Sequence, residues 1–239
     1  KLWEPAGPIR QAYLVDSLDH LGASIDRQLM IRHGDPLEIV PEVARAAGAT
    51  SVHIAADYGP YGSARDTAVE QVLESIGVPL TRTGSPYAVA PGRVTKGDGT
   101  PYRVFTPFYR AWLAHGWRGP ADDPTTDVEW WMPMECQGRP KVPGLTIELP
   151  EAGEKAAWKR WEFVRSEILA DYDETRNRPD LDGTSAMSHH LKYGEIHPRS
   201  ILAELSDRDD GFRREICWRE FNADVLHQQP DSIRASLDS

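Results

Sequence analysis

Apolar side chains along the N-terminal half alternate between helical spacing and short continuous runs. Apolar residues recur at intervals of three and four in three stretches, which predicts amphipathic helices over 8–21, 37–47 and 65–76. Between and after them lie short runs typical of buried strands, at 28–32, 51–55 and 79–82. Helices and strands that alternate with short connections are typical of a parallel α/β sheet, which binds ligands at the carboxyl ends of its strands.

The loop after the second predicted strand, residues 55–62, is rich in glycine and tyrosine. Its position makes it the expected ligand loop of the α/β domain. Tyr58 and Tyr61 can equally well do no more than cover the edge of the sheet. The sequence leaves both interpretations open.

The pattern changes after residue 83. Residues 84–101 are dense in turn-forming residues, and a helix is expected from Pro107. Residues 119–153 are rich in proline, glycine and aspartate without a sustained period, which predicts a long connector. One apolar stripe then predicts a continuous helix: Ala157, Trp161, Val164, Ile168 and Tyr172. Helical spacing returns over 198–205 and 212–226. We therefore expect an α/β domain over 1–118, a connector over 119–153 and a helical domain over 154–239.

Composition narrows the classes of function. The 239 residues carry a formal net charge of −10, which argues against a chain coated in basic residues but allows a local basic groove. Cys136 and Cys217 match no metal-ligand spacing and indicate free thiols in a reducing compartment. With no apolar run of bilayer length and no signal-peptide pattern, we expect a cytoplasmic monomer without membrane contact. The chain begins at Lys1 rather than Met, so we expect a piece of a longer protein.

A hydroxyl-rich turn in the helical part is the first candidate binding site. Asp182-Gly183 opens it, and Thr184, Ser185 and Ser188 follow within five positions. Hydroxyls and backbone N–H groups at the start of a helix can hold a phosphate without a cationic side chain. The alternative is an ordinary capped helix, and these residues alone favour it.

The segment 215–222 is the second candidate. Glu215, Trp218, Arg219 and Asn222 are spaced at i, i+3, i+4 and i+7 and are predicted to share one helix face. An indole can stack on a nucleobase, arginine can reach a phosphate, and carboxylate or amide groups can bind base edges. A salt-bridged surface face is the alternative. The adjacent pair His189-His190 lacks the spacing of a metal site, so we expect a structural role and no bound metal.

Together these motifs resemble the photolyase/cryptochrome family, in particular the bacterial photolyases that repair cyclobutane pyrimidine dimers. The similarity runs along the chain in the family's order, through Leu2-Trp-Glu-Pro5, His33-Gly-Asp-Pro36, Asp57-Tyr-Gly-Pro-Tyr61, Ala64-Arg-Asp66 and Val104-Phe-Thr-Pro-Phe-Tyr109. Its most specific parts are Leu181 to Arg199 and Glu215-x-x-Trp-Arg-Glu-Phe221.

The resemblance implies a Rossmann-like α/β domain with an antenna chromophore, followed by the start of an all-α domain that holds FAD. It implies that Tyr172 contacts FAD and that the diphosphate is bound by Thr184, Ser185, Ala186, Met187 and Ser188. It also places Arg176 near a DNA phosphate, with Glu215 hydrogen-bonded to a flipped-out pyrimidine dimer and Trp218 stacked on it. Excited reduced flavin would pass an electron to the dimer in damaged DNA, the ring would open and the electron would return.

Departures from the family pattern leave parts of this open. Met187, His189 and His197 replace the usual Leu, Pro or Ala, and Ser. Gly59 stands where many members carry a Glu that contacts folate, so the antenna, a deazaflavin or methenyltetrahydrofolate, is undetermined. By the resemblance, we expect the family's first strand and the second half of its flavin cavity to lie outside this chain. The alternatives are a cryptochrome-like light receptor and an inactive remnant acting at most as a binding module; Glu215 with Trp218 favours repair.

Overall fold

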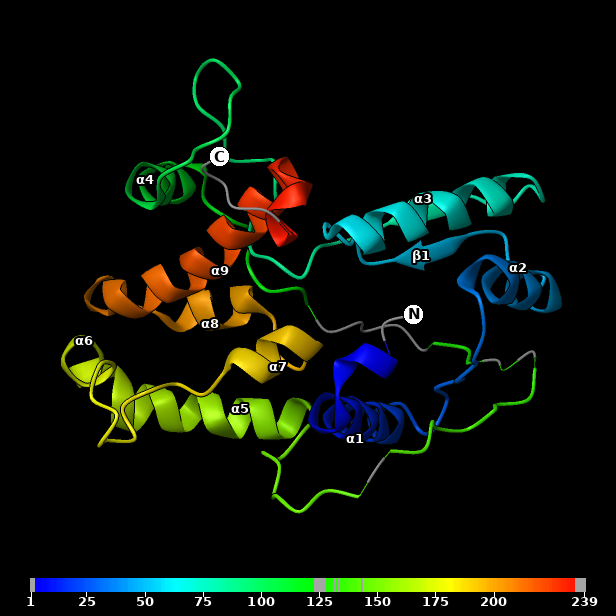
Figure 1. Ribbon diagram of the computed structural model, residues 1–239, viewed down its shortest axis with the longest axis horizontal. Coiled ribbons are helices and arrows are strands. Elements are labelled where there is room, and N and C mark those ends of the chain that lie inside the picture. Colours follow the sequence, from blue (N-terminus) through cyan, green and yellow to red (C-terminus); the bar gives the residue numbers. More distant parts are fainter. Residues whose placement is uncertain (1–2, 123–127, 131, 133, 143, 235–239) are drawn as a thin grey trace.

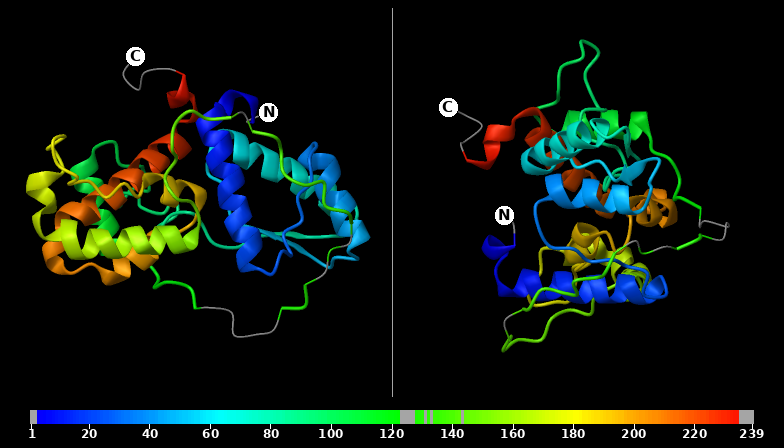
Figure 2. Two further views of the ribbon diagram at one scale, coloured as in Figure 1. Left: turned by 90° about the horizontal axis from the view of Figure 1, so that it is seen from below. Right: turned by 90° about the vertical axis from the view of Figure 1, so that its right-hand side faces the viewer.

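The computed structural model describes residues 3–122, 128–130, 132, 134–142 and 144–234 (Figure 1). An α/β body and a helical body lie side by side, and helix α1 runs along the junction between them (Figure 2). The α/β body contains α2 (Pro36–Ala46), β1 (Val52–Ile54), α3 (Pro60–Glu74) and β2 (Leu80–Arg82), and α1 spans Pro8–Ser24. The helical body contains α4 (Phe105–His115), α5 (Glu154–Phe163), α6 (Tyr172–Thr175), α7 (Ser188–Tyr193), α8 (Pro198–Glu204) and α9 (Asp210–Gln228).

The sheet is small and parallel. β1 pairs with β2 in the register Val52 to Leu80 and Ile54 to Arg82. Because parallel neighbours need a crossover connection, α3 lies between the two strands in sequence. A compact apolar core forms beside them from Ala44, Val69, Leu73, Val78 and Leu80. The fold-class prediction, a Rossmann-like α/β part followed by helices, is confirmed.

The strand predicted over 28–32 is wrong. In the structure this segment forms no strand, and its backbone groups bind the connector instead of the sheet. The Ile31 amide donates to Cys136 Sγ at 3.3 Å, and the Ile31 carbonyl accepts from the Gln137 amide at 3.0 Å. The His33 amide donates to Gln137 Oε1 at 2.6 Å. An apolar run predicts burial, but the partner of its backbone depends on which segment lies beside it.

The long helix predicted from Glu154 to Tyr172 is divided. After α5 comes a π turn over Val164–Ile168, then a 3₁₀ turn over Leu169–Asp171, and only then α6. At 100° per residue, the predicted stripe would drift by roughly 60° between its first and last members. The wider π turn corrects part of that drift. Trp161, Val164 and Ile168 therefore all remain buried.

The larger core belongs to the helical body, and it includes a segment from the predicted α/β domain. Ala88, Val89, Val94 and the buried side chains of α4 pack with the residues of α5 to α9. Residues 88–112 thus share a core with the helices that follow the connector, although the sequence grouped them with the sheet.

A buried carboxylate holds this segment against α9. Glu220 Oε1 accepts from the Ala88 amide at 2.5 Å, and its Oε2 accepts from the Val89 amide at 3.0 Å and from Trp112 Nε1 at 2.7 Å. Burial raises the pKa of Glu220, and these three N–H donors counteract that effect. The carboxylate therefore joins the 88–89 loop, α4 and α9 at one point.

Four further side chains of the helical body bind the same loop. Asp224 Oδ1 accepts from the Gly92 amide at 2.6 Å, and Arg219 donates to the Pro86 carbonyl at 2.9 Å. Arg199 donates to the Ala88 carbonyl, and His197 Nε2 lies 2.9 Å from the Ser85 carbonyl. All of these backbone partners lie within residues 85–92, which form the loop. The loop is therefore an ordered connection between the two bodies. Among the described helices, none combines the length and the apolar character that a bilayer crossing requires.

Candidate functional site: a phosphate-type turn beside an exposed tryptophan

Arg160 on α5 fixes the hydroxyl-rich turn from its inner side. Its Nε donates to the Ser185 carbonyl at 2.8 Å and its Nη2 to the Thr184 carbonyl at 2.9 Å. Ala186 follows with φ of 50°, a left-handed conformation that non-glycine residues rarely adopt. With the two carbonyls held by Arg160, the hydroxyl-bearing side chains of Thr184 and Ser188 are exposed. Met187 is buried in the core and anchors the turn from below.

Helix α7 begins directly after this turn, at Ser188. The first amides of a helix have no acceptor within the helix, so they are available to an anion. Ser185 Oγ accepts from the Met187 amide at 3.4 Å, which leaves only part of its hydrogen-bonding capacity for a ligand. The predicted binding residues therefore do lie together on one turn, with Met187 as a structural member.

Gly183 brings the turn against the end of α6. A Cβ atom added there would lie 2.6 Å from Thr175 Cβ and 2.7 Å from the Thr175 carbonyl oxygen. The Thr175 hydroxyl in turn donates to the Asp171 carbonyl at 2.9 Å. Only glycine permits this approach. The turn therefore contacts Thr175, which lies next to Arg176 and three residues from Tyr172.

Tyr172, Arg176 and Glu215 form one cluster between α6 and α9. The Tyr172 ring contacts Phe212 edge to face, with ring centroids 5.1 Å apart, and the Arg176 guanidinium lies 5.6 Å from the Tyr172 centroid. Burial, and then the nearby Glu215 charge, raise the pKa of the Tyr172 hydroxyl. The phenol is therefore neutral near pH 7 and can donate a hydrogen bond.

Glu215 combines an ion pair with an unused acceptor. Arg176 Nη1 lies 2.5 Å from the buried Glu215 Oε1 in an ion pair that fixes the carboxylate. The Glu215 side chain is nevertheless 34% exposed, so its second oxygen is open to a further donor. A carboxylate accepts several hydrogen bonds, and a ligand N–H can supply one of them.

Trp218 lies one turn further along α9 and is 39% exposed. Its ring stacks on Phe105 at the start of α4, with centroids 3.7 Å apart and an interplanar angle of 8°. Phe221 packs against it edge to face at 5.7 Å. One indole face is therefore covered by Phe105, while part of the ring remains open to a further planar group.

The other two members of the predicted face differ from each other. Asn222 is exposed, as expected for a surface position. Arg219 is turned inward: it donates to the Pro86 and Leu191 carbonyls, and its guanidinium lies 4.6 Å from the Tyr87 centroid. Burial lowers the pKa of Arg219. The expected single face is thus divided, because Arg219 serves the junction with the loop.

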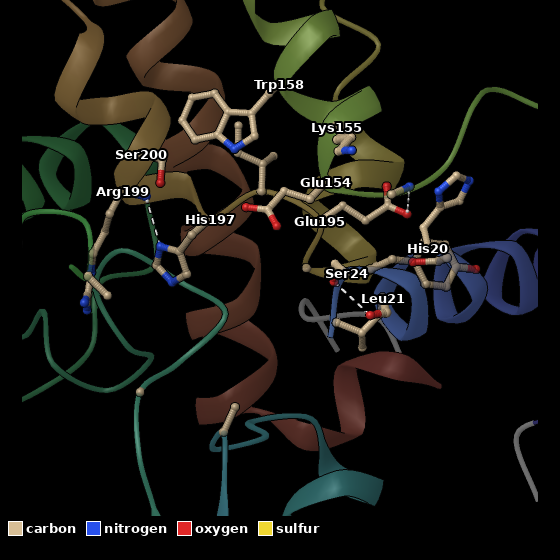
Figure 3. Close-up of a pocket in the computed structure, with 18 of the residues that line it drawn as sticks. His20, Leu21, Ser24, Glu154, Lys155, Trp158, Glu195, His197, Arg199 and Ser200 are labelled. Atoms are coloured by element: carbon tan, nitrogen blue, oxygen red, sulfur yellow. Dashed lines mark hydrogen bonds between the residues drawn. The ribbon is translucent and has the colours of Figure 1, made fainter. Parts of the chain in front are cut away.

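A second feature is a cleft of about 1090 Å³ at the junction of the two bodies (Figure 3). It includes the residues that follow both strands, Ala55 after β1 and Thr83 after β2, which is the expected ligand position in a parallel sheet. His20 of α1 and Trp158 of α5 line it from the other elements. Of the predicted loop 55–62, only Ala55 lines the cleft. Tyr58 instead packs edge to face against Tyr87 and His227.

The histidine pair belongs to the junction. His190 Nδ1 lies 2.5 Å from Glu195 Oε2, which also accepts from the Tyr13 hydroxyl at 2.7 Å. The Gly153 amide donates to Glu195 Oε1 at 2.8 Å. His189 packs its ring against Tyr13 edge to face. In the described part of the chain, no group of histidine, cysteine or carboxylate side chains is arranged to hold a metal ion.

Sequence reasoning missed Arg160, Phe105 and Glu220. The buried role of Glu220 could have been predicted, because it lies on the apolar stripe of α9 with Ile216 and Phe221. A carboxylate in such a position must find buried donors. The sequence gives no indication of the roles of Arg160 and Phe105, because those roles depend on partners 24 or more residues away.

Comparison with known proteins is consistent with this geometry. A sequence model described as DNA photolyase matches residues 2–127. A deoxyribodipyrimidine photo-lyase from a Synechococcus species is 31% identical over 253 residues, which cover 93% of this chain and 52% of the relative. The chain spans about half the length of the curated photo-lyases it matches.

Solved structures give the same result. A bacterial class III photolyase from Agrobacterium tumefaciens superposes with a TM-score of 0.77 at 28% identity, over 94% of this chain and 51% of that one. A cryptochrome from Synechocystis superposes equally well, at 0.77 over 96% of this chain and 53% of that one, but at 20% identity it shows the fold alone. Because the family model covers more than half of the chain and the fold agrees along nearly all of it, this chain belongs to the DNA photolyase/cryptochrome family.

Proposed function

We propose that the chain forms half of a light-driven DNA repair enzyme that splits cyclobutane pyrimidine dimers, a deoxyribodipyrimidine photo-lyase. The observation that carries the proposal is the pairing of the Glu215 carboxylate, fixed by Arg176 and partly exposed, with an exposed, stacked Trp218 one helical turn away. A flipped-out pyrimidine pair offers both an imide N–H and a planar surface, which match these two groups.

FAD is the cofactor that fits the neighbouring turn. Exposed hydroxyls at Thr184 and Ser188 and the first amides of α7 suit a diphosphate, while Ser185, Ala186 and Met187 shape the turn. Tyr172 would contact the cofactor from α6. When bound, FAD supplies the light-excited electron donor for ring opening.

The chain's own residues would prepare the substrate for that electron. Glu215 accepts a hydrogen bond from the imide N–H of a flipped base, and Arg176 orients its carboxylate and neutralises a nearby phosphate. Trp218 stacks on the dimer from one side, supported by Phe105 on its other face. Asn222 would bind DNA at the edge of this surface. Arg219 contributes indirectly, by fixing α9 against the 85–92 loop.

The junction cleft is the proposed place of an antenna chromophore. It lies where both strands end, and Trp158 and His20 offer aromatic surface to a planar ring (Figure 3). A deazaflavin and methenyltetrahydrofolate differ in absorption, so the spectrum of the purified protein identifies which of them is held. We further propose a location in the cytoplasm, a reducing compartment that keeps Cys136 and Cys217 as free thiols, and a monomeric protein.

Blue-light illumination of the FAD-loaded, reduced full-length protein that contains this chain, with a dimer-containing oligonucleotide, tests the proposal. We expect dimers to disappear with time in the light and to persist in the dark. Tight flavin binding without dimer loss would instead favour a cryptochrome-like light receptor. A chain that binds neither flavin nor damaged DNA would favour the inactive remnant.

A further inference from the structure

A hairpin before α4 projects from the body beside the start of that helix (Figure 1). Its two sides meet in an antiparallel bridge between Thr95 and Pro101, and the Lys96 amide donates to the Thr100 carbonyl at 2.9 Å. Val94 is buried in the core of the helical body, and Tyr102 packs against the same core. The hairpin is therefore anchored at its base and ordered at its turn.

The hairpin and α4 are basic in an acidic chain. From Arg93 to Ala121 the sequence holds five cations and one carboxylate, a local charge of +4 within a total of −10. The cations are Arg93, Lys96, Arg103, Arg110 and Arg118, and all five are exposed. Among the described residues, no carboxylate forms an ion pair with them.

The one acidic residue of this segment is already engaged. Asp98 Oδ1 accepts from the Thr100 amide at 2.9 Å and from the Thr100 hydroxyl at 2.7 Å. These hydrogen bonds lower the pKa of Asp98 and fix its carboxylate within the turn. The lysine and arginine side chains therefore project without an ion-pair partner.

The basic segment leads directly into the aromatic pair. Arg103 and Val104 immediately precede Phe105, which stacks on Trp218 at 3.7 Å. Val104 is 62% exposed, a large fraction for an apolar side chain at a helix start. Cations, an exposed apolar side chain and an exposed indole thus adjoin one another on residues distant in sequence.

We propose that the 93–104 hairpin is a DNA-backbone clamp, with Lys96 and Arg103 binding phosphates that flank the lesion. Phosphates are the partner that exposed cations in an acidic chain can select by charge, independently of base sequence. The hairpin leads directly into Phe105, so its cations are placed to reach the phosphates next to a base stacked on Trp218. Those phosphates would lie alongside α4. This inference rests on the proposed function and adds a second surface that contacts the DNA.

Fluorescence anisotropy with a labelled duplex, once intact and once carrying a pyrimidine dimer, tests the clamp across a salt series. We expect Arg103→Glu and Lys96→Glu each to weaken binding of both duplexes by about five- to tenfold at low salt. Each should also reduce the slope of log affinity against log salt by about one. Arg45→Glu, the same kind of charge reversal at an exposed position of α2, is the control and should change neither quantity.

The outcomes separate the two claims. Equal binding by the wild type, the hairpin variants and the Arg45 variant would overturn the clamp, as would a wild type that binds neither duplex. A wild type that binds both duplexes equally well, while the hairpin variants bind both more weakly, would count against dimer recognition and leave the clamp standing. Circular dichroism melts confirm folding, and Lys96→Gln should show a smaller loss in the same direction.

Discussion

Side chains of α9 point into two different environments, and their chemistry follows from that division. Glu215 and Trp218 face the open side, with a partly exposed carboxylate paired to Arg176 and an exposed ring. Arg219 and Glu220 are turned into the junction and hydrogen-bonded mainly to backbone groups. The sequence predicted the first pair by spacing. It did not separate Arg219 from that pair, because i+4 spacing gives a direction and not a partner.

Replacing Glu220 by Gln tests the junction at the scale of one side chain. Glutamine keeps one oxygen for the three N–H donors and turns an NH2 group toward the others. We expect a loss of about 1–3 kcal/mol in the free energy of unfolding, measured by urea denaturation with tryptophan fluorescence. Glu74→Gln, at an exposed position of α3, should change it by less than about 0.5 kcal/mol. Equal effects would mean that Glu220 is not a structural acceptor.

His197 makes the stability depend on pH. Its Nδ1 accepts from the Arg199 amide at 3.1 Å, and burial lowers its pKa, as burial also lowers that of His189. In the weakly acidic range the unfolded chain therefore binds more protons than the folded one. The contribution is complete above the unfolded pKa of about 6.5 and is lost as the pH falls toward the folded pKa.

The expected result is a free energy of unfolding that decreases from pH 7 to pH 5. His197→Asn keeps a capping oxygen for the Arg199 amide and removes the titration, so the decrease should be smaller in this variant. Urea denaturation at several pH values measures both slopes. Identical slopes would show that His197 is not protonated on unfolding.

Two close contacts between neighbouring elements require glycine, and both help to build the site. Gly183 lets the turn before α7 approach α6, and Gly211 lets α9 begin against Asp173. Helix existence was predictable from apolar spacing for α1, α2, α3, α4, α5, α8 and α9. The π and 3₁₀ turns between α5 and α6 were not, because they depend on which side of the stripe must stay buried.

Gly183→Ala tests the contact between the turn and α6. The added methyl would strike the Thr175 carbonyl, a backbone atom that cannot rotate away, so the turn must shift. We expect FAD affinity to fall by about tenfold or more, measured by flavin fluorescence quenching on titration. Gly119→Ala, where no atom lies within 4 Å of the new methyl, should bind like the wild type. An unchanged affinity in Gly183→Ala would remove the turn from the cofactor site.

The whole molecule couples two bodies through one ordered loop. Residues 85–92 are hydrogen-bonded to side chains of α8 and α9, while Glu195 joins α1 to α7. The local sequence pattern predicted the fold class, an α/β part followed by helices. It did not predict how the bodies meet, since the contacts join residues more than 100 positions apart.

Light-dependent loss of pyrimidine dimers, compared between wild type and Glu215→Gln, tests the central claim most directly. The variant keeps the size of the side chain but replaces its charged acceptor, which is worth about 1.5 kcal/mol or roughly tenfold. We predict repair in blue light by the FAD-loaded wild type, a rate about tenfold lower in Glu215→Gln, and none in the dark. Flavin-loaded protein that leaves dimers intact in the light, or a variant that repairs as fast as the wild type, would contradict the account.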